Sequence, residues 1–247
     1  VSVSAPYTIF SPNSDGRKDF LVIEQDGSSE KVWNAEIRNS DGDTITTKQW
    51  LKRSPDNFTW NGKNSRGEVV PDGNYSYIIS SVDKAGNSVE RVLQDITVST
   101  ISTSVQLTRN YQTFSPNDDG IKDAITLTPT VKVTDGIREW TARVINDSGI
   151  AVWTQSGSGT PRPISYTGET DGGGTVPDGE YTAELSVLYR NGNKPEAETK
   201  SFVVDNQAPA ADVSVNYEIF SPDGDKDKDT LVIEQDTSAE DRWSGRI

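Results

Sequence analysis

Short stretches of alternating hydrophobic and polar residues run along most of this chain. Trp33, Ala35 and Ile37 alternate with Asn, Glu and Arg, and a similar alternation occupies residues 140–144. A period of two residues is typical of a β-strand that buries one face. Helical periodicity is not convincing in any segment, so the pattern predicts an all-β fold.

The same passage occurs three times. Phe-Ser-Pro begins at Phe10, Phe114 and Phe220, and each time an Asp-, Asn- and Gly-rich loop and then an apolar run follow. The first two copies also share a later Val-Pro-Asp-Gly turn, which ends at Gly73 and Gly179. A spacing of about one hundred residues is the size of a whole domain. We therefore expect each copy to open a new domain.

Each complete copy contains about seven short predicted strands, a number typical of an immunoglobulin-like sandwich. Because cysteine is absent, the Cys-Trp-Cys pattern of antibody domains is missing. The prediction is therefore an all-β fold of tandem immunoglobulin-like (fibronectin-III-like) β-sandwiches. The predicted domains are residues 1–101 and 102–207, with residues 208–247 as the incomplete start of a third.

The tryptophans divide into two predicted groups. Trp33, Trp140 and Trp243 alternate with polar residues and are interpreted as core residues, whereas Trp50 and Trp60 are candidates for exposure.

The third copy is too small to bury its apolar residues by itself. We expect either that the natural chain continues or that another chain completes this copy.

Composition narrows the classes of function. The 247 residues include 38 Asp and Glu against 24 Lys and Arg, and the formal charge of −14 repels nucleic acids and anionic lipids. Histidine is absent as well as cysteine, which removes the usual Ser-His and Cys-His catalytic pairs. No apolar run has the length of a membrane span. We predict a protein that is not an enzyme, has no nucleic-acid partner and makes no direct membrane insertion.

The acidic loops are candidate Ca²⁺ sites. Calcium takes roughly six to eight oxygen ligands, and oxygen side chains at alternate positions of a turning loop can surround one ion. The pattern is strongest in the third copy, where a carboxylate occupies every second position. The candidate metal ligands are Asn13, Asp15 and Asp19 in the first copy, Asn117, Asp119 and Asp123 in the second, and Asp223, Asp225, Asp227 and Asp229 in the third.

Turn chemistry without an ion is the alternative explanation of these loops. Asn and Asp side chains mimic backbone hydrogen bonds, and Asn, Asp and Gly tolerate a left-handed backbone, so Asx-turns suffice for the first two copies. The spacing also lacks the glutamate that closes an EF-hand loop. Asp72 and Asp178, in the two Pro-Asp-Gly turns, are attributed to turn chemistry alone.

Two motifs carry a family resemblance. Phe-Ser-Pro-Asn-x-Asp-Gly-x-x-Asp, from Phe10, and Trp-Asn-Gly followed by Val-Pro-Asp-Gly-x-Tyr, from Trp60, resemble bacterial Ig-like repeat domains. Examples are the Ig-like domain of the flagellar hook-capping protein and the C-terminal modules of gliding-motility and cell-surface proteins. The second copy departs from the motif at Tyr166 and the third at Lys226. The resemblance implies an extracellular, cell-surface or periplasmic location, but no ligand.

One leading hypothesis and two alternatives follow. The first is a structural or adhesive spacer of a secreted or surface-displayed protein, stiffened by Ca²⁺. Its partners would be neighbouring Ig-like domains of the same or another chain, together with a glycan or protein surface ligand. The first alternative is a carbohydrate-binding accessory module of a secreted enzyme, which requires exposed aromatic side chains. The second is a filament subunit whose incomplete repeat is completed by a neighbouring chain through strand donation.

Overall fold

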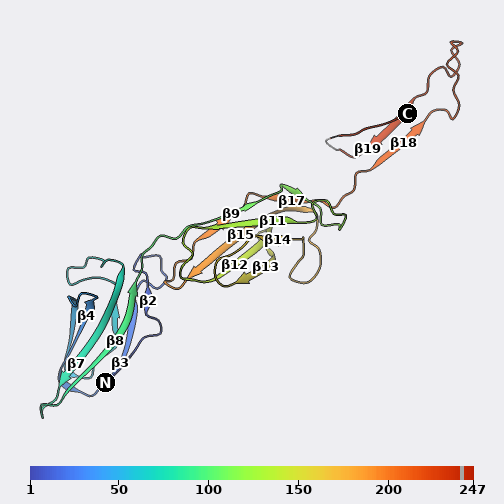
Figure 1. The fold of residues 1–247 in the computed structure, drawn as a ribbon. Coiled ribbons are helices and arrows are strands. Elements are labelled where there is room, and N and C mark those ends of the chain that lie inside the picture. The colour runs from blue at the N-terminus through green and yellow to red at the C-terminus, as the bar shows by residue number, and fades with distance from the viewer. Residues whose placement is uncertain (240–241) are drawn as a thin grey trace. The chain divides into compact units, whose positions relative to one another are not determined.

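The computed structural model describes residues 1–239 and 242–247, and every regular element in these ranges is a β-strand (Figure 1). The all-β prediction is confirmed. The chain forms two units, Val1–Val204 and Asp205–Ile247. Among the described residues, no helix has the length and apolar character needed to cross a membrane.

The first repeat is a sandwich of two sheets. One sheet has the strand order β1-β3-β6, and the other has the order β2-β8-β7-β4-β5. The chain changes sheets between β1 and β2, because β1 pairs with β3 whereas β2 runs parallel to β8. The strands are β1 (Ser2–Ser4), β2 (Ile9–Phe10), β3 (Leu21–Asp26), β4 (Glu30–Asn39), β5 (Thr44–Arg53), β6 (Phe58–Trp60), β7 (Gly73–Val82) and β8 (Ser88–Val98).

The second repeat has the same topology. Its sheets have the orders β14-β11-β9 and β10-β17-β15-β12-β13, and its last long strand is divided into β16 and β17, which both pair with β15. Each repeat therefore has the two-layer arrangement of an immunoglobulin-like domain. The strands are β9 (Val105–Arg109), β10 (Thr113–Phe114), β11 (Ile125–Val131), β12 (Ile137–Asn146), β13 (Ala151–Gly157), β14 (Ile164–Tyr166), β15 (Gly179–Tyr189), β16 (Glu196–Glu198) and β17 (Phe202–Val204).

Each repeat buries its own hydrophobic core. Trp33 and Trp140 are buried as predicted, but the expectation that Trp50 and Trp60 are exposed is wrong, since each is only 2% exposed. Trp50 lies opposite Trp33 in the β4–β5 ladder. The Trp60 ring packs edge-on against Phe10, and its Nε1 donates a hydrogen bond to a backbone carbonyl, so its polar group is satisfied inside.

The two sequence motifs of each repeat pack against each other. Gly62 of Trp-Asn-Gly has φ +68°, and a Cβ atom at this position would lie 2.6 Å from Cγ of Pro12 in Phe-Ser-Pro. In the second repeat, Gly168 meets Pro116 in the same way, at 2.7 Å. The motifs are distant in sequence but lie side by side in the fold. The proline ring of one motif packs on the glycine of the other, which has no side chain to obstruct it.

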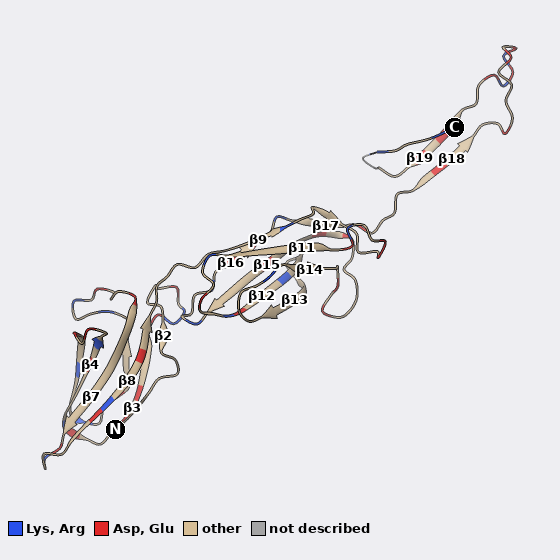
Figure 2. Ribbon diagram, in the orientation of Figure 1, with Lys and Arg blue, Asp and Glu red and all other residues tan. Residues whose placement is uncertain are grey.

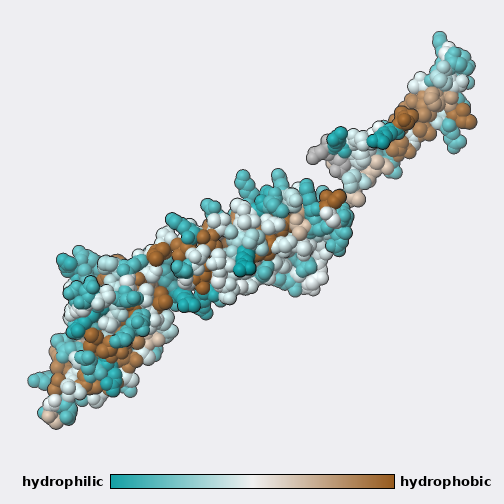
Figure 3. Space-filling model, viewed as in Figure 1, coloured by the Kyte–Doolittle hydropathy of each residue, from teal (hydrophilic) through white to brown (hydrophobic). Residues whose placement is uncertain are grey.

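The third copy lies in the second unit, Asp205–Ile247. It consists of a two-stranded hairpin of β18 (Ala211–Val215) and β19 (Ile233–Thr237). Its apolar side chains lie on the surface, as Figure 3 shows, and the prediction that Trp243 is a core residue is wrong, since it is 44% exposed. No second sheet covers the hairpin within the described part of this copy. The domain limits at residues 101 and 207 stay predictions.

Candidate metal-binding loops

The three acidic loops have one backbone conformation. In the first, the Ser11 N–H donates to the Lys18 carbonyl at 2.9 Å, and the corresponding bonds of the other copies measure 3.0 and 3.1 Å. Positive φ recurs at alternate residues, which are Ser14, Gly16 and Lys18 in the first loop. The left-handed region costs a non-glycine residue roughly 1–2 kcal/mol. A loop that adopts it at equivalent positions in every copy is a defined structure.

The acidic side chains hold this backbone in place. In the first loop, Asn13 Oδ1 accepts a hydrogen bond from the Asp15 N–H at 3.1 Å, and Asp15 Oδ1 accepts one from the Arg17 N–H at 2.8 Å. The Asp19 carboxylate accepts from the N–H groups of Ser14 and Gly16. These are the Asx-turn bonds of the alternative explanation. The second loop repeats the pattern with Asn117, Asp119 and Asp123.

The first ligand position of the loop is an asparagine amide in the first two copies and an aspartate carboxylate in the third. Asn13 Nδ2 donates to Asp15 Oδ2 at 3.1 Å, and Asn117 Nδ2 donates to Asp119 Oδ2 at 3.2 Å. In the third loop Asp223 replaces the asparagine, so this donor is lost. The carboxylates of Asp15 and Asp119 therefore each accept a hydrogen bond from the asparagine two residues earlier. The equivalent Asp225 has the Asp223 carboxylate at that position instead.

The third loop brings three of its four predicted ligands together. Carboxylate oxygens of Asp223, Asp225 and Asp229 lie within 4.8 Å of one another. Asp227 is not in this group, although its N–H donates to Asp225 Oδ1 at 2.8 Å. At such distances each pair of like charges repels by about 1 kcal/mol even in water. Acidic residues also occur along the strands (Figure 2), but within the described part of the chain three carboxylates converge in this way only in the third loop.

A repeated Lys–Tyr contact was missed by the sequence reasoning. Lys18 Nζ lies 4.5 Å from the centre of the Tyr7 ring, and the equivalent pairs in the second and third copies measure 5.5 and 5.1 Å. The lysine that precedes the last aspartate of each loop therefore rests on an aromatic face. The signal in the sequence was a tyrosine three residues before each Phe-Ser-Pro. The other two pairs are Lys122 with Tyr111 and Lys228 with Tyr217.

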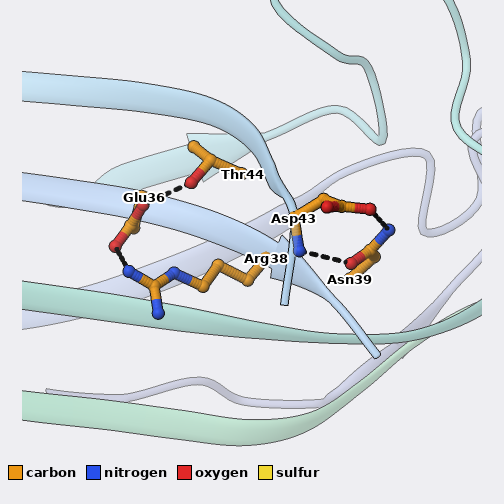
Figure 4. A network of polar contacts seen from close by, with 5 residues as sticks. All are labelled: Glu36, Arg38, Asn39, Asp43 and Thr44. Atoms are coloured by element: carbon orange, nitrogen blue, oxygen red, sulfur yellow. Dashed lines mark hydrogen bonds and ion pairs between the residues drawn. The ribbon is translucent and has the colours of Figure 1, made fainter. Parts of the chain in front are cut away.

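Similar turn chemistry closes ordinary hairpins of this protein. At the β4–β5 turn, Asn39 Oδ1 accepts from the Asp43 N–H at 2.8 Å, and Asn39 Nδ2 donates to Asp43 at 3.1 Å (Figure 4). Beside it, partial burial acts to raise the pKa of Glu36, but hydrogen bonds from Thr44 and Arg38 outweigh burial and hold that pKa below its ordinary value. Asn–Asp contacts alone therefore do not identify a metal site, and among the residues that the structure describes only the third loop adds converging carboxylates.

The first repeat is similar in sequence to a known family of secretion domains. Residues 4–94, less than half of the chain, match the family model described as the CHU_C type IX secretion signal domain. A search of curated proteins finds no significant match.

Three solved structures align with most of this chain at low sequence identity. A tetra-tandem repeat from the extending region of a large adhesion protein is 19% identical, with a TM-score of 0.34, and the alignment covers 95% of this chain and 55% of that one. Fibronectin(III)-like modules of Clostridium thermocellum CbhA are 16% identical, with a TM-score of 0.43 and coverages of 83% and 95%. Chicken CNTN1 FN1–FN3 domains are 10% identical, with a TM-score of 0.40 and coverages of 80% and 67%.

The chain spans about half the length of the adhesion-protein structure that it matches. The strand order shows that the first repeat has an Ig-like fold, and residues 4–94 within it are similar to the type IX secretion signal domain.

Proposed function

We propose that this chain is a non-catalytic structural segment of a secreted or surface-displayed bacterial protein, in which tandem Ig-like domains act as a spacer. The observation that carries the proposal is the repetition of a whole domain, with its own core and the same loop, in the first unit. A secretion signal is needed once in a chain, whereas a spacer gains length from every copy. The match of residues 4–94 to a type IX secretion signal domain supports export from the cell.

The finer part of the proposal is that Ca²⁺ binds the acidic loops, beginning with the third. Asp223, Asp225 and Asp229 supply the hard oxygen donors that Ca²⁺ prefers, and an ion would remove their mutual repulsion. Backbone carbonyls and water would complete the coordination shell. The first two loops offer fewer charges, and Asn13 and Asn117 already donate to their neighbouring aspartates. We therefore expect weaker binding there.

Calorimetric titration of the chain with Ca²⁺ tests the metal site. The expected result is one strongest site, which Asp225→Asn removes and Asp236→Asn, an exposed change in β19, leaves intact. Binding only to the folded form stabilises it by about 2.7 kcal/mol when free Ca²⁺ is one hundred times Kd. Absence of binding heat, together with superimposable melting curves in Ca²⁺ and in chelator, would contradict a Ca²⁺ role but not the spacer role.

Extension tests the spacer role directly. In single-molecule pulling, a mechanical spacer of two sandwiches should give two separate unfolding events for the first unit, because each repeat has its own core. A gradual extension without discrete events would overturn the spacer proposal, whatever the outcome of the Ca²⁺ titration.

The exposed apolar residues of the third copy favour a second candidate, completion by another polypeptide. Val213 is 65% exposed, Ile219 81% and Phe220 44%. A donated strand would cover such residues, as in strand-addition assemblies. A clean monomer by size-exclusion chromatography, with protease cleavage after Asn206, would exclude a filament.

The carbohydrate-binding alternative has lost the aromatics that motivated it, since Trp50 and Trp60 are buried.

A further inference from the structure

We propose that the acidic loop of the first repeat has a second role, as the docking site for the Asn191-Gly192-Asn193 turn of the second repeat. Both belong to the unit Val1–Val204. The turn follows β15 and leads to β16, and the loop joins β2 to β3. The partner of the loop is thus another copy of the same domain, and the contact makes the junction a joint of fixed geometry. This inference does not depend on metal binding.

Direct hydrogen bonds join the loop to the turn. Asn13 Nδ2 donates to Asn193 Oδ1 at 3.0 Å, and Lys18 Nζ donates to the Arg190 carbonyl at 2.8 Å. Burial, and secondarily the charge of Arg138 in the second repeat, lowers the pKa of Lys18. Lys18 therefore has second-repeat groups around it in addition to the Tyr7 ring beneath it.

The turn also holds the linker between the repeats. Asn191 Nδ2 donates to the Ser99 carbonyl at 3.1 Å, and Asn193 Nδ2 donates to the Ile101 carbonyl at 2.9 Å. Both asparagines are 7% exposed. Buried amides need partners, and the amide of Asn193 has both of its ends engaged, one by the loop and one by the linker.

Gly192 allows the two backbones to approach closely. Its φ is +101°, and a Cβ atom there would lie 2.9 Å from the Arg17 carbonyl oxygen and 3.0 Å from Lys18 Cβ. The first of these atoms belongs to the backbone and cannot move aside as a flexible side chain could. Any other residue at this position would push the turn away from the loop.

The equivalent turn of the first repeat provides an internal comparison. Gly86 has a similar φ of +88°, but a Cβ atom there would meet nothing within 4 Å. Ala85 stands in the place of Asn191, and Asp83 closes the turn on itself by accepting from the N–H groups of Ala85 and Asn87. Asn191 also closes its own turn, since its Oδ1 accepts from the Asn193 N–H at 3.1 Å. Asn87, the equivalent of Asn193, donates through Nδ2 to Asp83 inside its own turn. In the second repeat, by contrast, Asn191 Nδ2 and the Asn193 amide bond to the linker and to the loop of the first repeat.

Distance measurements between spin labels test this joint. The chain has no cysteine, so Lys48→Cys and Gln155→Cys, at exposed positions in β5 and β13, label each repeat once. In chelator, the parent should show a narrow distance distribution. Gly192→Ala should broaden it at least twofold, whereas Gly86→Ala, with the same backbone strain but no clash, should leave it narrow. An unchanged width in Gly192→Ala, or a broad distribution in the parent, would overturn the proposal.

A second pair of variants removes bonds without adding a side chain. Lys18→Met combined with Asn13→Ala deletes both loop-to-turn bonds, and Lys122→Met combined with Asn117→Ala makes the same changes in the loop of the second repeat. Only the first pair should broaden the distribution. Equal broadening by both pairs would show that the loops affect only their own domains, and would reject the joint.

Discussion

The carboxylate of Asp72 accepts hydrogen bonds from both the backbone N–H and the hydroxyl of Thr100, at 2.8 and 2.7 Å. Asp72 lies in the Pro-Asp-Gly turn before β7, and Thr100 lies just after β8, where the chain leaves the first repeat. The sequence reasoning attributed Asp72 to turn chemistry alone. The structure shows that it also holds the start of the linker.

Asp72→Ala should loosen this attachment. Loss of the acceptor is expected to cost about 1 kcal/mol, the usual net value of a hydrogen bond, and to increase hydrogen exchange at the Thr100 amide. Asp41→Ala, an exposed aspartate in the β4–β5 turn, is the control. Unchanged protection of Thr100 in the Asp72 variant would show that this contact does not restrain the linker.

Gly62→Ala should destabilise the first repeat through the Pro12 contact. Alanine at positive φ costs roughly 1–2 kcal/mol, and overpacking adds about 1–3 kcal/mol. Gly67→Ala is the matched control, since Gly67 has φ +82° and open space around it. Denaturant unfolding should separate the two variants by the overpacking cost. Equal losses would mean that the motifs are not coupled by packing.

Replacement of Trp140 and of Trp243, both predicted from the sequence to be core residues, should change the free energy of unfolding by different amounts. Trp140→Ala removes a core residue that is 8% exposed and should cost about 3–5 kcal/mol. Trp243→Ala, at an exposed site, should change the unfolding free energy of the first unit by less than about 0.5 kcal/mol. Acrylamide should quench the fluorescence of Trp243 more strongly than that of Trp140. A large loss of first-unit stability in the Trp243 variant would contradict its placement.

The first repeat should lose stability in alkali. Burial raises the pKa of Tyr77, whose Oη donates a hydrogen bond to Gln25 Oε1 at 2.6 Å. A raised pKa in the folded state means that this contribution is fully present below about pH 10, the pKa of an unfolded tyrosine, and is lost as the pH rises above it.

Urea unfolding between neutral pH and pH 11 measures this dependence. Tyr77→Phe should lower stability at neutral pH by about 1 kcal/mol, because it removes the hydrogen bond to Gln25, and should flatten the alkaline slope of the first repeat. The control is Tyr111→Phe in the second repeat, at a ring that is 40% exposed. A slope that is unchanged by Tyr77→Phe would refute the assignment.

The candidate metal site was predictable in part. Alternating oxygen side chains identified the loop residues, and the third loop was ranked first because it has a carboxylate at every second position. That Asp223, Asp225 and Asp229 converge while Asp227 does not depends on which residues adopt positive φ, which the side-chain pattern does not specify. The Lys18–Tyr7 contact was missed because its partners lie in different connections, Tyr7 before β2 and Lys18 after it.

Strand periodicity and repetition are local properties of the chain, so the amino-acid sequence alone was enough to predict the all-β class, the threefold repetition and the cores around Trp33 and Trp140. The burial of Trp50 and Trp60, the packing of Pro12 on Gly62 and the hydrogen bond between Asn13 and Asn193 are seen only in the folded protein. These contacts join residues distant in sequence, and their energies depend on how two sheets or two repeats come together. A pattern with a period of two residues contains no information about that geometry.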